Sequence, residues 1–435
     1  MLDLKKQFKH KKILIYGFGI SGRACFYYLK KKNDIFIYDD EQKQIPSLFK
    51  KYKITKKKIL NNKFDFIVIS PGIDKKKCGL SSFIKKNENK TITELDIFFL
   101  HNLKNKKITI TGTNGKSTTA KLLYHIIKKN RKDVRLAGNI GRPLLLERNI
   151  KKNTIFVIEA SSYQIEYSKY FRTDLSAILN ISPDHLDRHV TFSKYVGAKL
   201  KLIMHQNKKD LSFIRKQDLK LIRNKKIKCK IIIVNKLPKI NIKLNNNFFY
   251  NLNNFENLTF ALSISKKLKL NKKKIEDAVN SFNGLPFRQQ VIIKKKNLQI
   301  INDSKSTSFS STTQLLKSFR NIFWILGGLP KKGDKFTLEK KYFKNIKAYI
   351  YGNNKNFFQK KIRNKIPFKN FKNIKYALLE VLKDAKKEKD KNINVIFSPC
   401  AASFDQFDNF EQRGNSFNKI LKKINFIKKY YERNF

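Results

Sequence analysis

The sequence predicts an α/β protein with three domains in series. Short apolar runs alternate with segments of helical periodicity along the chain, a pattern typical of parallel sheets. Glycine-rich turns follow the first apolar run of two successive segments, and 435 residues suffice for two or three domains of about 150 residues. Because 41% of the residues are hydrophobic, each domain can bury its own core. We place the domains at residues 1–103, 104–285 and 286–435.

The first domain is expected to be Rossmann-like. Its predicted strands are apolar and short, and they cover Lys12–Tyr16, Ile35–Tyr38 and Phe64–Ile69. A glycine turn and an amphipathic segment that ends near Leu29 separate the first two strands. This strand, turn and helix order predicts a parallel sheet whose carboxyl edge binds a ligand.

The glycine turn of this domain has the spacing G-x-G-x-x-G. Gly17, Gly19 and Gly22 form it, and Asp39 follows about 20 residues later. Alone, this pattern suggests NAD or FAD and a dehydrogenase. A pyrophosphate on a helix N-terminus is common to all nucleotide diphosphates, however, so a UDP-sugar fits equally. A turn that serves only packing is the remaining alternative.

The second domain is expected to resemble a P-loop ATPase with a mostly parallel sheet. Strands are predicted at Lys107–Thr111, Thr154–Ile158 and Leu175–Leu179, and a helix at Thr118–Lys129. Between the first strand and the helix lies the motif G-x-x-G-K-S, formed by Gly112, Gly115, Lys116 and Ser117. Its backbone amides and lysine could bind a triphosphate, and its serine hydroxyl could bind Mg²⁺. The full P-loop pattern has glycine where this chain has Ile110, so a plain connecting turn is the alternative.

The third domain, also expected to be Rossmann-like, begins after a turn-rich linker at residues 283–286. Strands are predicted at Leu298–Ile301, Ile322–Leu326, Ala348–Tyr351 and Asn394–Phe397.

The strong positive charge does not by itself indicate a nucleic-acid partner. The formal net charge is +63, but lysines occur in every segment, whereas nucleic-acid binders usually concentrate charge on one face or arm. Runs such as Lys56–Lys58, Lys272–Lys274 and Lys294–Lys296 are interpreted as solvated surface. A nucleic-acid-dependent NTPase is nevertheless kept as an alternative, because the phosphate loop and the charge both suit it.

The composition favours a cytoplasmic protein. The first twelve residues contain no apolar segment of the kind found in secretory signals, and no apolar run reaches the roughly 18 residues of a membrane span. The four cysteines, Cys25, Cys78, Cys229 and Cys400, are far apart without a CxxC pair, which disfavours a zinc knuckle and a disulfide framework.

Three polar residues after the phosphate loop could hold charge or metal. Glu159 ends a predicted strand, His185 lies in SPDHLDRH, and Lys199 lies in YVGAKLKLI. Mg²⁺ prefers oxygen ligands, so Glu159 suits it better than His185. Each residue alone has an ordinary structural explanation: a capped strand end, a hydrogen-bonded histidine, an exposed lysine. Together, after a phosphate loop, they favour a catalytic site.

Several longer motifs resemble the Mur ligases. TGTNGKST, GNIG, EASSYQIE, NISPDHLDRH and YVGAKLKLI resemble their ATP-binding domain, and LPFR, NDSKST, LGG and SPCAASFDQFDNFEQRGNSF resemble the third domain of the members that add D-glutamate. The match runs from Gly17 to Phe417. The sister Mur ligases and folylpolyglutamate synthase share the phosphate loop but have a different third-domain signature. They remain alternatives.

The resemblance implies an ATP-dependent ligase that joins D-glutamate to UDP-N-acetylmuramoyl-L-alanine through an acyl phosphate, in peptidoglycan precursor synthesis. It implies a Mg²⁺ cofactor and a carbamylated Lys199. We further expect a monomer without nucleic acid or membrane insertion. Ser308 stands where the family usually has Asn, and Phe287 where many members have His, so the contacts around these positions are open.

The implied site residues fall into groups by ligand. The residues implied in catalysis are Lys116, Glu159, His185 and Lys199. Those implied in ATP binding are Gly112, Thr113, Asn114, Gly115, Lys116, Ser117, Thr118, Asn254, Asn257, Arg288 and Asp303. Those implied in binding the UDP substrate are Ile20, Ser21, Asp39, Ser70, Pro71, Gly72 and Asn139. Those implied in binding D-glutamate are Lys305, Thr307, Lys331 (or its neighbour Lys332), Ser403 and Phe410. The implied Mg²⁺ ligands are Ser117, Glu159, His185 and Lys199.

Overall fold

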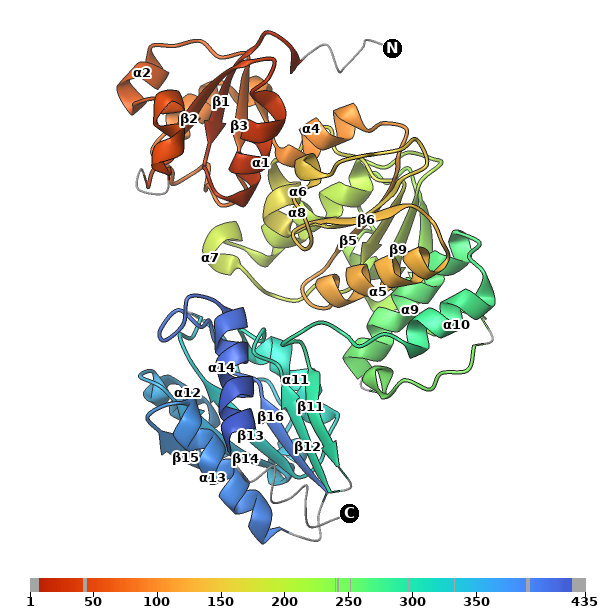
Figure 1. Ribbon diagram of the computed structural model, residues 1–435, viewed down its shortest axis with the longest axis vertical. Coiled ribbons are helices and arrows are strands. Elements are labelled where there is room, and N and C mark those ends of the chain that lie inside the picture. Colours follow the sequence, from red (N-terminus) through yellow and green to blue (C-terminus); the bar gives the residue numbers. More distant parts are fainter. Residues whose placement is uncertain are drawn as a thin grey trace. The chain divides into compact units, whose positions relative to one another are not determined.

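The computed structural model describes residues 8–41, 45–238, 240, 242–250, 252–295, 297–331, 333–388 and 392–424. These residues form three sheets (Figure 1). Within them every strand pairing is parallel except that of β11 with β12. The predicted α/β class is therefore confirmed. The chain divides into two compact units, residues 1–245 with 257–282, and residues 246–256 with 283–435.

The first sheet lies in the first unit and has the strand order β2-β1-β3-β4. Its strands are β1 (Lys12–Tyr16), β2 (Asp34–Tyr38), β3 (Phe66–Ile69) and β4 (Thr91–Ile92). Its helices are α1 (Ile20–Leu29), α2 (Lys56–Leu60), α3 (Ser81–Lys86) and α4 (Glu94–His101), with 3₁₀ turns η3 (Ser47–Tyr52) and η4 (Glu88–Lys90). The central strand β1 is a continuous apolar run because neighbouring strands and helices cover it.

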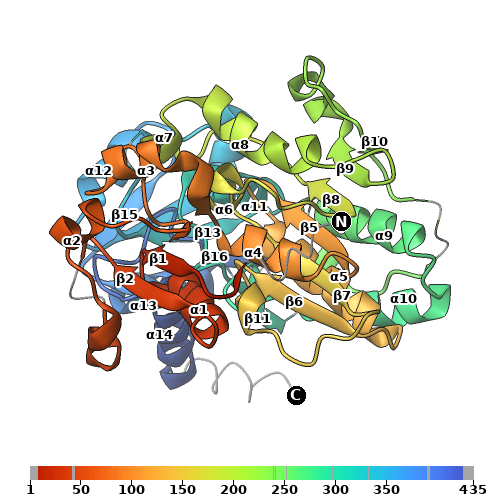
Figure 2. The same ribbon diagram turned by 90° about the horizontal axis from the view of Figure 1, so that it is seen from above.

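The second sheet, in the same unit, has the order β10-β9-β8-β5-β7-β6. Its strands are β5 (Lys106–Thr111), β6 (Val134–Gly138), β7 (Ile155–Glu159), β8 (Leu175–Ile178), β9 (Leu211–Arg215) and β10 (Lys230–Val234). Its helices are α5 (Lys116–Lys129), α6 (Ser162–Tyr167), α7 (Leu186–His189), α8 (Phe192–Met204), α9 (Leu252–Lys267) and α10 (Lys272–Asn280), and η5 (Leu144–Leu146) and η6 (Lys216–Leu221) are 3₁₀ turns. Helix α5 packs against β5, β6, β7 and α10, whereas α8 packs against β8, α6 and α7 (Figure 2).

The third sheet forms the second unit and has the order β11-β12-β16-β13-β14-β15. Its strands are β11 (Gln290–Lys295), β12 (Leu298–Asn302), β13 (Ile322–Gly327), β14 (Ile346–Tyr351), β15 (Phe368–Phe371) and β16 (Ile393–Phe397). Its helices are α11 (Phe309–Lys317), α12 (Lys355–Ile362), α13 (Ile374–Lys387) and α14 (Phe410–Lys423), with 3₁₀ turns η7 (Asn247–Phe249) and η8 (Lys340–Asn345).

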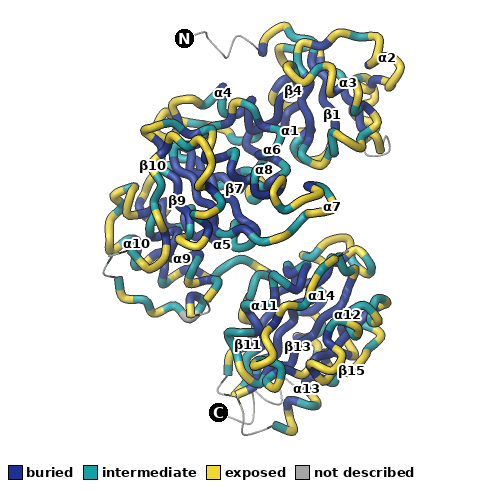
Figure 3. Tube along the Cα trace, turned by 180° about the vertical axis from the view of Figure 1, so that it is seen from behind, coloured by how far each residue is buried: buried dark blue, intermediate teal, exposed yellow. Residues whose placement is uncertain are grey.

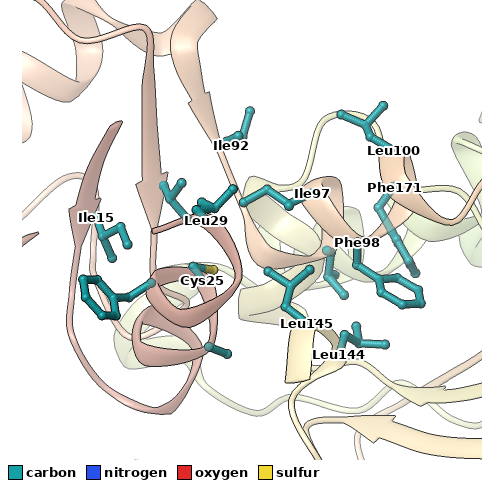
Figure 4. Close-up of a cluster of buried hydrophobic side chains, with 14 of the residues drawn as sticks. Ile15, Cys25, Leu29, Ile92, Ile97, Phe98, Leu100, Leu144, Leu145 and Phe171 are labelled. Atoms are coloured by element: carbon teal, nitrogen blue, oxygen red, sulfur yellow. The ribbon is translucent and has the colours of Figure 1, made fainter. Parts of the chain in front are cut away.

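The central strands of all three sheets are largely buried, whereas the edge strands β10, β11 and β15 are more exposed (Figure 3). One apolar cluster spans the first two sheets: Cys25 and Leu29 of α1, Phe98 of α4, and Leu144 and Leu145 of η5 belong to it (Figure 4). The first and second sheets therefore share a core. Within the described part of the chain, no helix is both long and apolar enough to span a bilayer.

A buried carboxylate reinforces this junction. Asp96 of α4 completes a capping box with Thr93 and also accepts hydrogen bonds from the loop after α6. Lys107, at the start of β5, caps the other end of α4, since its ammonium donates to the Asn102 carbonyl at 2.8 Å. Both ends of α4 are thus hydrogen-bonded to the second sheet or its loops.

Candidate active site

The phosphate loop connects β5 to α5, as the motif predicted. Gly112 and Gly115 both have positive φ, +153° and +83°, which favours glycine. A Cβ on Gly115 would lie 2.2 Å from the Asn257 side-chain oxygen. The segment after β8 holds the loop, because the amides of Thr113 and Asn114 donate at 2.8 Å to the main-chain and side-chain oxygens of Asn180.

Two lysines converge on one carbonyl of this loop. Lys116 Nζ donates to the Gly112 oxygen at 2.9 Å, and Lys199 Nζ, from α8, donates to the same oxygen at 2.8 Å. Lys199 is only 1% exposed. Burial, and then the positive charge of Lys116, lower the pKa of Lys199 well below its ordinary value. A lysine in this setting readily gives up its proton and becomes a neutral amine.

Glu159 lies at the carboxyl end of β7, in register with Ile110 of β5 and Gly138 of β6. Its Oε1 accepts a hydrogen bond from Asn139 Nδ2 at 2.8 Å. Its Oε2 is buried and has no hydrogen-bond partner among the described residues. An orphaned buried carboxylate oxygen is suited to a cation. Ser117, at the start of α5, is also buried.

His185 precedes α7 in a left-handed conformation, with φ 54°. Its Nε2 lies 3.4 Å from Asp184 Oδ2, and its ring lies 5.0 Å from that of Tyr163. In the described segments no three His, Cys, Asp or Glu residues are arranged to hold a metal. The donors present fit an ion such as Mg²⁺, which takes few protein oxygens and relies on phosphate oxygens and water for the rest.

The turn after β1 is held by groups that were implied to bind the UDP substrate. Asp39 Oδ2 accepts from the Phe18 amide at 2.7 Å, and Ser70 Oγ donates to the Gly17 carbonyl at 2.6 Å. Ser21 makes a hydrogen bond with buried Glu94, whose pKa burial raises. The structure therefore gives Asp39, Ser70 and Ser21 structural contacts within the domain.

The other residues of this group are more open. Ile20 is 74% exposed, Gly72 is exposed and Pro71 is half-buried. Asn139 follows β6, and its main-chain N–H donates to the main-chain carbonyl of Glu159 at 2.9 Å. Asn139 therefore lies beside Glu159 in the second sheet.

The four residues implied in ATP binding that lie outside the phosphate loop, Asn254, Asn257, Arg288 and Asp303, are divided between the units. Asn257 belongs to the first unit, where its side-chain oxygen accepts from Thr119 Oγ1 at 3.1 Å. Asn254, Arg288 and Asp303 belong to the second unit. Asn254 Nδ2 donates to the Phe248 carbonyl at 2.9 Å.

Asp303 and the turn that carries Arg288 are bonded to each other. Asp303 accepts from the Gln289 amide at 3.1 Å and from Ser398 Oγ at 2.8 Å. Burial raises the pKa of Asp303 to about 7. Phe287 and Gln289, on either side of Arg288, both have positive φ. Asp303 therefore fixes this turn.

The residues implied in binding D-glutamate lie on three connected loops of the second unit. Lys305 Nζ lies 3.8 Å from the centre of the Phe410 ring. Leu329, two residues before Lys331, exchanges backbone hydrogen bonds at 2.9 Å with Ala402, the neighbour of Ser403. Thr307 is half-buried, and Lys332 lies outside the described residues.

Arg413 of α14, which the motif analysis did not single out, connects two of these loops. Its guanidinium is fully buried and donates to the Ser304 carbonyl at 2.7 Å and to the Ala401 carbonyl at 2.9 Å. Nothing in the sequence apart from its place inside the last motif pointed to this role.

Comparison with known proteins identifies the family. The chain is 34% identical to the UDP-N-acetylmuramoylalanine–D-glutamate ligase of Rickettsia prowazekii, over 96% of this chain and 99% of that protein. It is 35% identical to the protein of the same name from Buchnera aphidicola, over 95% of this chain and 98% of that protein. The chain belongs to the Mur ligase family. The model of the Mur ligase middle domain matches residues 110–274.

Solved Mur ligases share the fold. The MurF ligase of Thermotoga maritima, solved in complex with ADP, superposes with a TM-score of 0.55 at 16% identity, over 84% of this chain and 91% of that one. The UDP-N-acetylmuramate–alanine ligase of the same organism superposes with a TM-score of 0.54 at 16% identity, over 95% and 99%. These likenesses confirm the three-domain α/β architecture of a Mur ligase.

The two departures from the Mur ligase pattern have local explanations. Ser308 precedes α11 as its N-cap residue, a position where serine and asparagine serve equally. The Phe287 ring lies against α14, where a Cβ on Gly414 would approach it to 2.3 Å. Phe287 therefore packs as an apolar residue against a glycine.

Proposed function

We propose that this Mur ligase joins D-glutamate to the L-alanine carboxyl of UDP-N-acetylmuramoyl-L-alanine at the expense of ATP. The observation that carries the proposal is the similarity to D-glutamate ligases over nearly the full length of both proteins. That similarity includes the third domain, in which the amino-acid acceptor is expected to bind. A cytoplasmic monomer is part of the proposal.

The reaction needs two steps. A carboxylate oxygen of the substrate attacks the γ-phosphorus of ATP, the bond to the β-phosphate oxygen breaks, and an acyl phosphate and ADP form. The D-glutamate amine then attacks the acyl carbon, phosphate leaves, and the amine loses a proton. Both substrates of the first step are anions, so the site must offset their repulsion.

The residues of the phosphate loop supply that offset. The amides in the first turn of α5, which have no acceptor within the helix, can donate to phosphate oxygens, and Lys116 adds a positive charge. Holding both reactants in line is itself worth several kcal/mol, up to about 7–11 in favourable cases. Mg²⁺, when bound by Ser117 and the free oxygen of Glu159, would neutralise phosphate charge.

A carbamylated Lys199 is part of this proposal. Its buried amine has a lowered pKa, and the neutral amine is the form whose nitrogen lone pair attacks the carbon of CO₂. An N–C bond forms, the nitrogen loses a proton, and the ammonium that would repel Mg²⁺ becomes an anionic oxygen ligand. The proposal also keeps His185 as a Mg²⁺ ligand, together with Ser117, Glu159 and Lys199.

The test of the function is ATP-dependent phosphate release by the purified protein. We expect release with UDP-N-acetylmuramoyl-L-alanine and D-glutamate, and little with L-glutamate, meso-diaminopimelate or no acceptor. Equal release with all acceptors would contradict the substrate assignment, and stimulation by a polynucleotide alone would favour an NTPase instead.

The carbamate has its own test. Lys199→Ala is expected to lose most activity, and bicarbonate is expected to raise the activity of wild-type protein that has been depleted of CO₂. Full activity of Lys199→Ala, together with no effect of bicarbonate, would show that the carbamate idea is wrong.

A further inference from the structure

We propose that Arg188 is a positioning residue that fixes the substrate loop, residues 70–75, against the α7 segment that carries His185. This inference rests on the function proposed above. Arg188 belongs to the second sheet's domain and the substrate loop to the first, and both lie in one compact unit. The inference concerns the alignment of the two substrates.

The guanidinium of Arg188 donates hydrogen bonds to three successive carbonyls of the substrate loop. Nη2 donates to Ile73 at 2.6 Å and to Pro71 at 3.4 Å, and Nη1 donates to Gly72 at 3.3 Å. The side chain is only 11% exposed, so water competes weakly for these donors. A planar fork with several fixed N–H groups suits such an arrangement, and a lysine ammonium could not reproduce it.

Tyr167 of α6 completes the connection. Its hydroxyl accepts from Arg188 Nη2 at 2.9 Å and from the Lys75 amide at 3.2 Å. The Lys75 ammonium lies 4.3 Å from the centre of the same ring. The substrate loop is thus bound at its middle by Arg188 and at its end by Tyr167.

Arg188 also contacts Tyr163 of α6, whose ring packs on His185. Its guanidinium carbon lies 4.9 Å from the centre of the Tyr163 ring, and this ring lies 5.0 Å from His185 and 5.3 Å from His189. A displacement of the Arg188 side chain would therefore be transmitted to Tyr163 and to the rings that pack on it.

The short helix α7 is strained at both ends, which makes such support necessary. His185 has φ 54°, and Val190, a β-branched residue, has φ 67° and ψ −50°. The amide of Thr191 donates to the His189 carbonyl at 2.7 Å, so Val190 lies at the centre of a γ-turn of the rare, strained type. Such conformations persist only where surrounding contacts hold them.

The consequence for catalysis concerns geometry more than affinity. If the substrate loop and the His185 segment shift relative to each other, the carboxylate and the γ-phosphate lose their alignment. A misplacement of about 1 Å can lower a rate by about 100-fold. Nucleotide binding by the phosphate loop should be spared, because the described contacts of Arg188 do not include that loop.

The kinetic test compares Arg188→Met and Arg188→Lys with Arg223→Met, in which an exposed arginine of the same unit is changed. For both Arg188 variants we expect kcat to fall by about 10- to 100-fold, KM for the UDP substrate to rise, and the Kd of ADP in calorimetry to change by less than about twofold. Arg223→Met should match wild type. Recovery of kcat in Arg188→Lys, or an equal loss of ADP affinity, would overturn the proposal.

Tyr167→Phe provides a milder variant in case Arg188→Met does not fold. It removes only the hydroxyl that both Arg188 and Lys75 contact, and we expect kcat to fall by about 3- to 10-fold with unchanged ADP affinity. If Tyr167→Phe folds and leaves both kcat and the hydrogen exchange of residues 70–78 unchanged, the proposed connection between Arg188, Tyr167 and the substrate loop is overturned.

Hydrogen exchange tests the connection without any substrate. In Arg188→Met, peptides that cover residues 70–78 should exchange faster than in wild type, while peptides that cover β1 should not change. Unchanged exchange in the loop would refute the positioning role even if the ligase activity is as proposed. Faster exchange in a protein that lacks D-glutamate ligase activity would instead refute the function and leave the contact intact.

Discussion

Asp96 offers a sharp test of how the first two domains are held together. Its carboxylate accepts six hydrogen bonds at 2.7–3.0 Å, all from groups near the start of α4 and in the loop after α6. The donors are the amide and hydroxyl of Thr93, the hydroxyl of Ser168, and the amides of Lys169, Tyr170 and Phe171. We expect Asp96→Ala to destabilise the first unit strongly, and Asp96→Asn to do so less.

The magnitude follows from which donors can reach water after the change. Lys169 is half-buried and Tyr170 exposed, so their amides can be hydrated. The hydroxyls of Thr93 and Ser168 can rotate towards another acceptor, whereas the main-chain amides of Thr93 and Phe171 are fixed and buried. Each buried amide left without a partner costs about 1–3 kcal/mol. Asp96→Ala should therefore lower the free energy of unfolding by about 2–6 kcal/mol. Asp96→Asn keeps one acceptor oxygen and should cost about 1–2 kcal/mol.

Differential scanning calorimetry of the ligand-free protein measures the effect. For a unit of this size, about 1 kcal/mol shifts Tm by about 2–4 °C, so Asp96→Ala should lower Tm by roughly 4–24 °C. The control is Asp277→Asn, at an exposed position on α10, which should stay within about 0.5 kcal/mol of wild type. An Asp96→Ala protein as stable as this control would refute the reasoning, as would an Asp96→Asn protein less stable than Asp96→Ala.

Other predictions concern the phosphate loop and the third domain. Because the pKa of Asp303 is raised to about 7, its folded form keeps a proton that the unfolded form loses, so its contribution to stability is complete at low pH and is lost as pH rises towards 7. Asp303→Asn should therefore raise Tm relative to wild type at pH 8 and not at pH 5; the same difference at both pH values would contradict this. Gly115→Ala should weaken ADP binding by about tenfold or more in calorimetry, because alanine would be strained in the backbone conformation of Gly115. Gly197→Ala, where a Cβ meets nothing within 4 Å, should bind ADP normally. Gly414→Ala should clash with the Phe287 ring and destabilise the second unit by about 1–3 kcal/mol, measured by thermal melting.

Much of the fold follows from local sequence. The runs that predicted strands at Lys12–Tyr16 and Ile322–Leu326 are apolar apart from Lys12 at the start of the first, since parallel strands are covered on both faces. Glycine spacing marked both nucleotide-type turns because the backbone there needs positive φ or a close approach. At Gly22, for example, a Cβ would lie 2.0 Å from the Gly17 carbonyl.

Elements with weaker local signals were not predicted. Strand β6 contains Arg135 and ends in Gly138, and the two-residue strand β4 is too short to show a period. The antiparallel pairing of β11 with β12 depends on the turn between them and on the sheet they join.

Contacts between residues that lie far apart in the sequence could not be predicted from local sequence patterns either. Asp96 accepts from amides more than 70 positions away, and Arg188 donates to carbonyls about 115 positions earlier. Each residue is recognisable as a helix cap or a motif member, but only the folded chain brings its partners to it. The residues implied by the family motifs keep their assigned roles as predictions, which the experiments above address.

The apolar cluster shared by the first two sheets bears on how the protein can be dissected. A recombinant fragment that stops at residue 103 would lack part of this cluster, namely Leu144, Leu145 and Phe171. The apolar side chains of α4, Ile97, Phe98 and Leu100, would then be exposed, and we expect such a fragment to aggregate. Among the described residues, the apolar clusters around the third sheet draw on residues from Ile292 onward. A cut between the first two sheets is therefore unfavourable, and domain-swap chimaeras between relatives should exchange the first two domains as one piece.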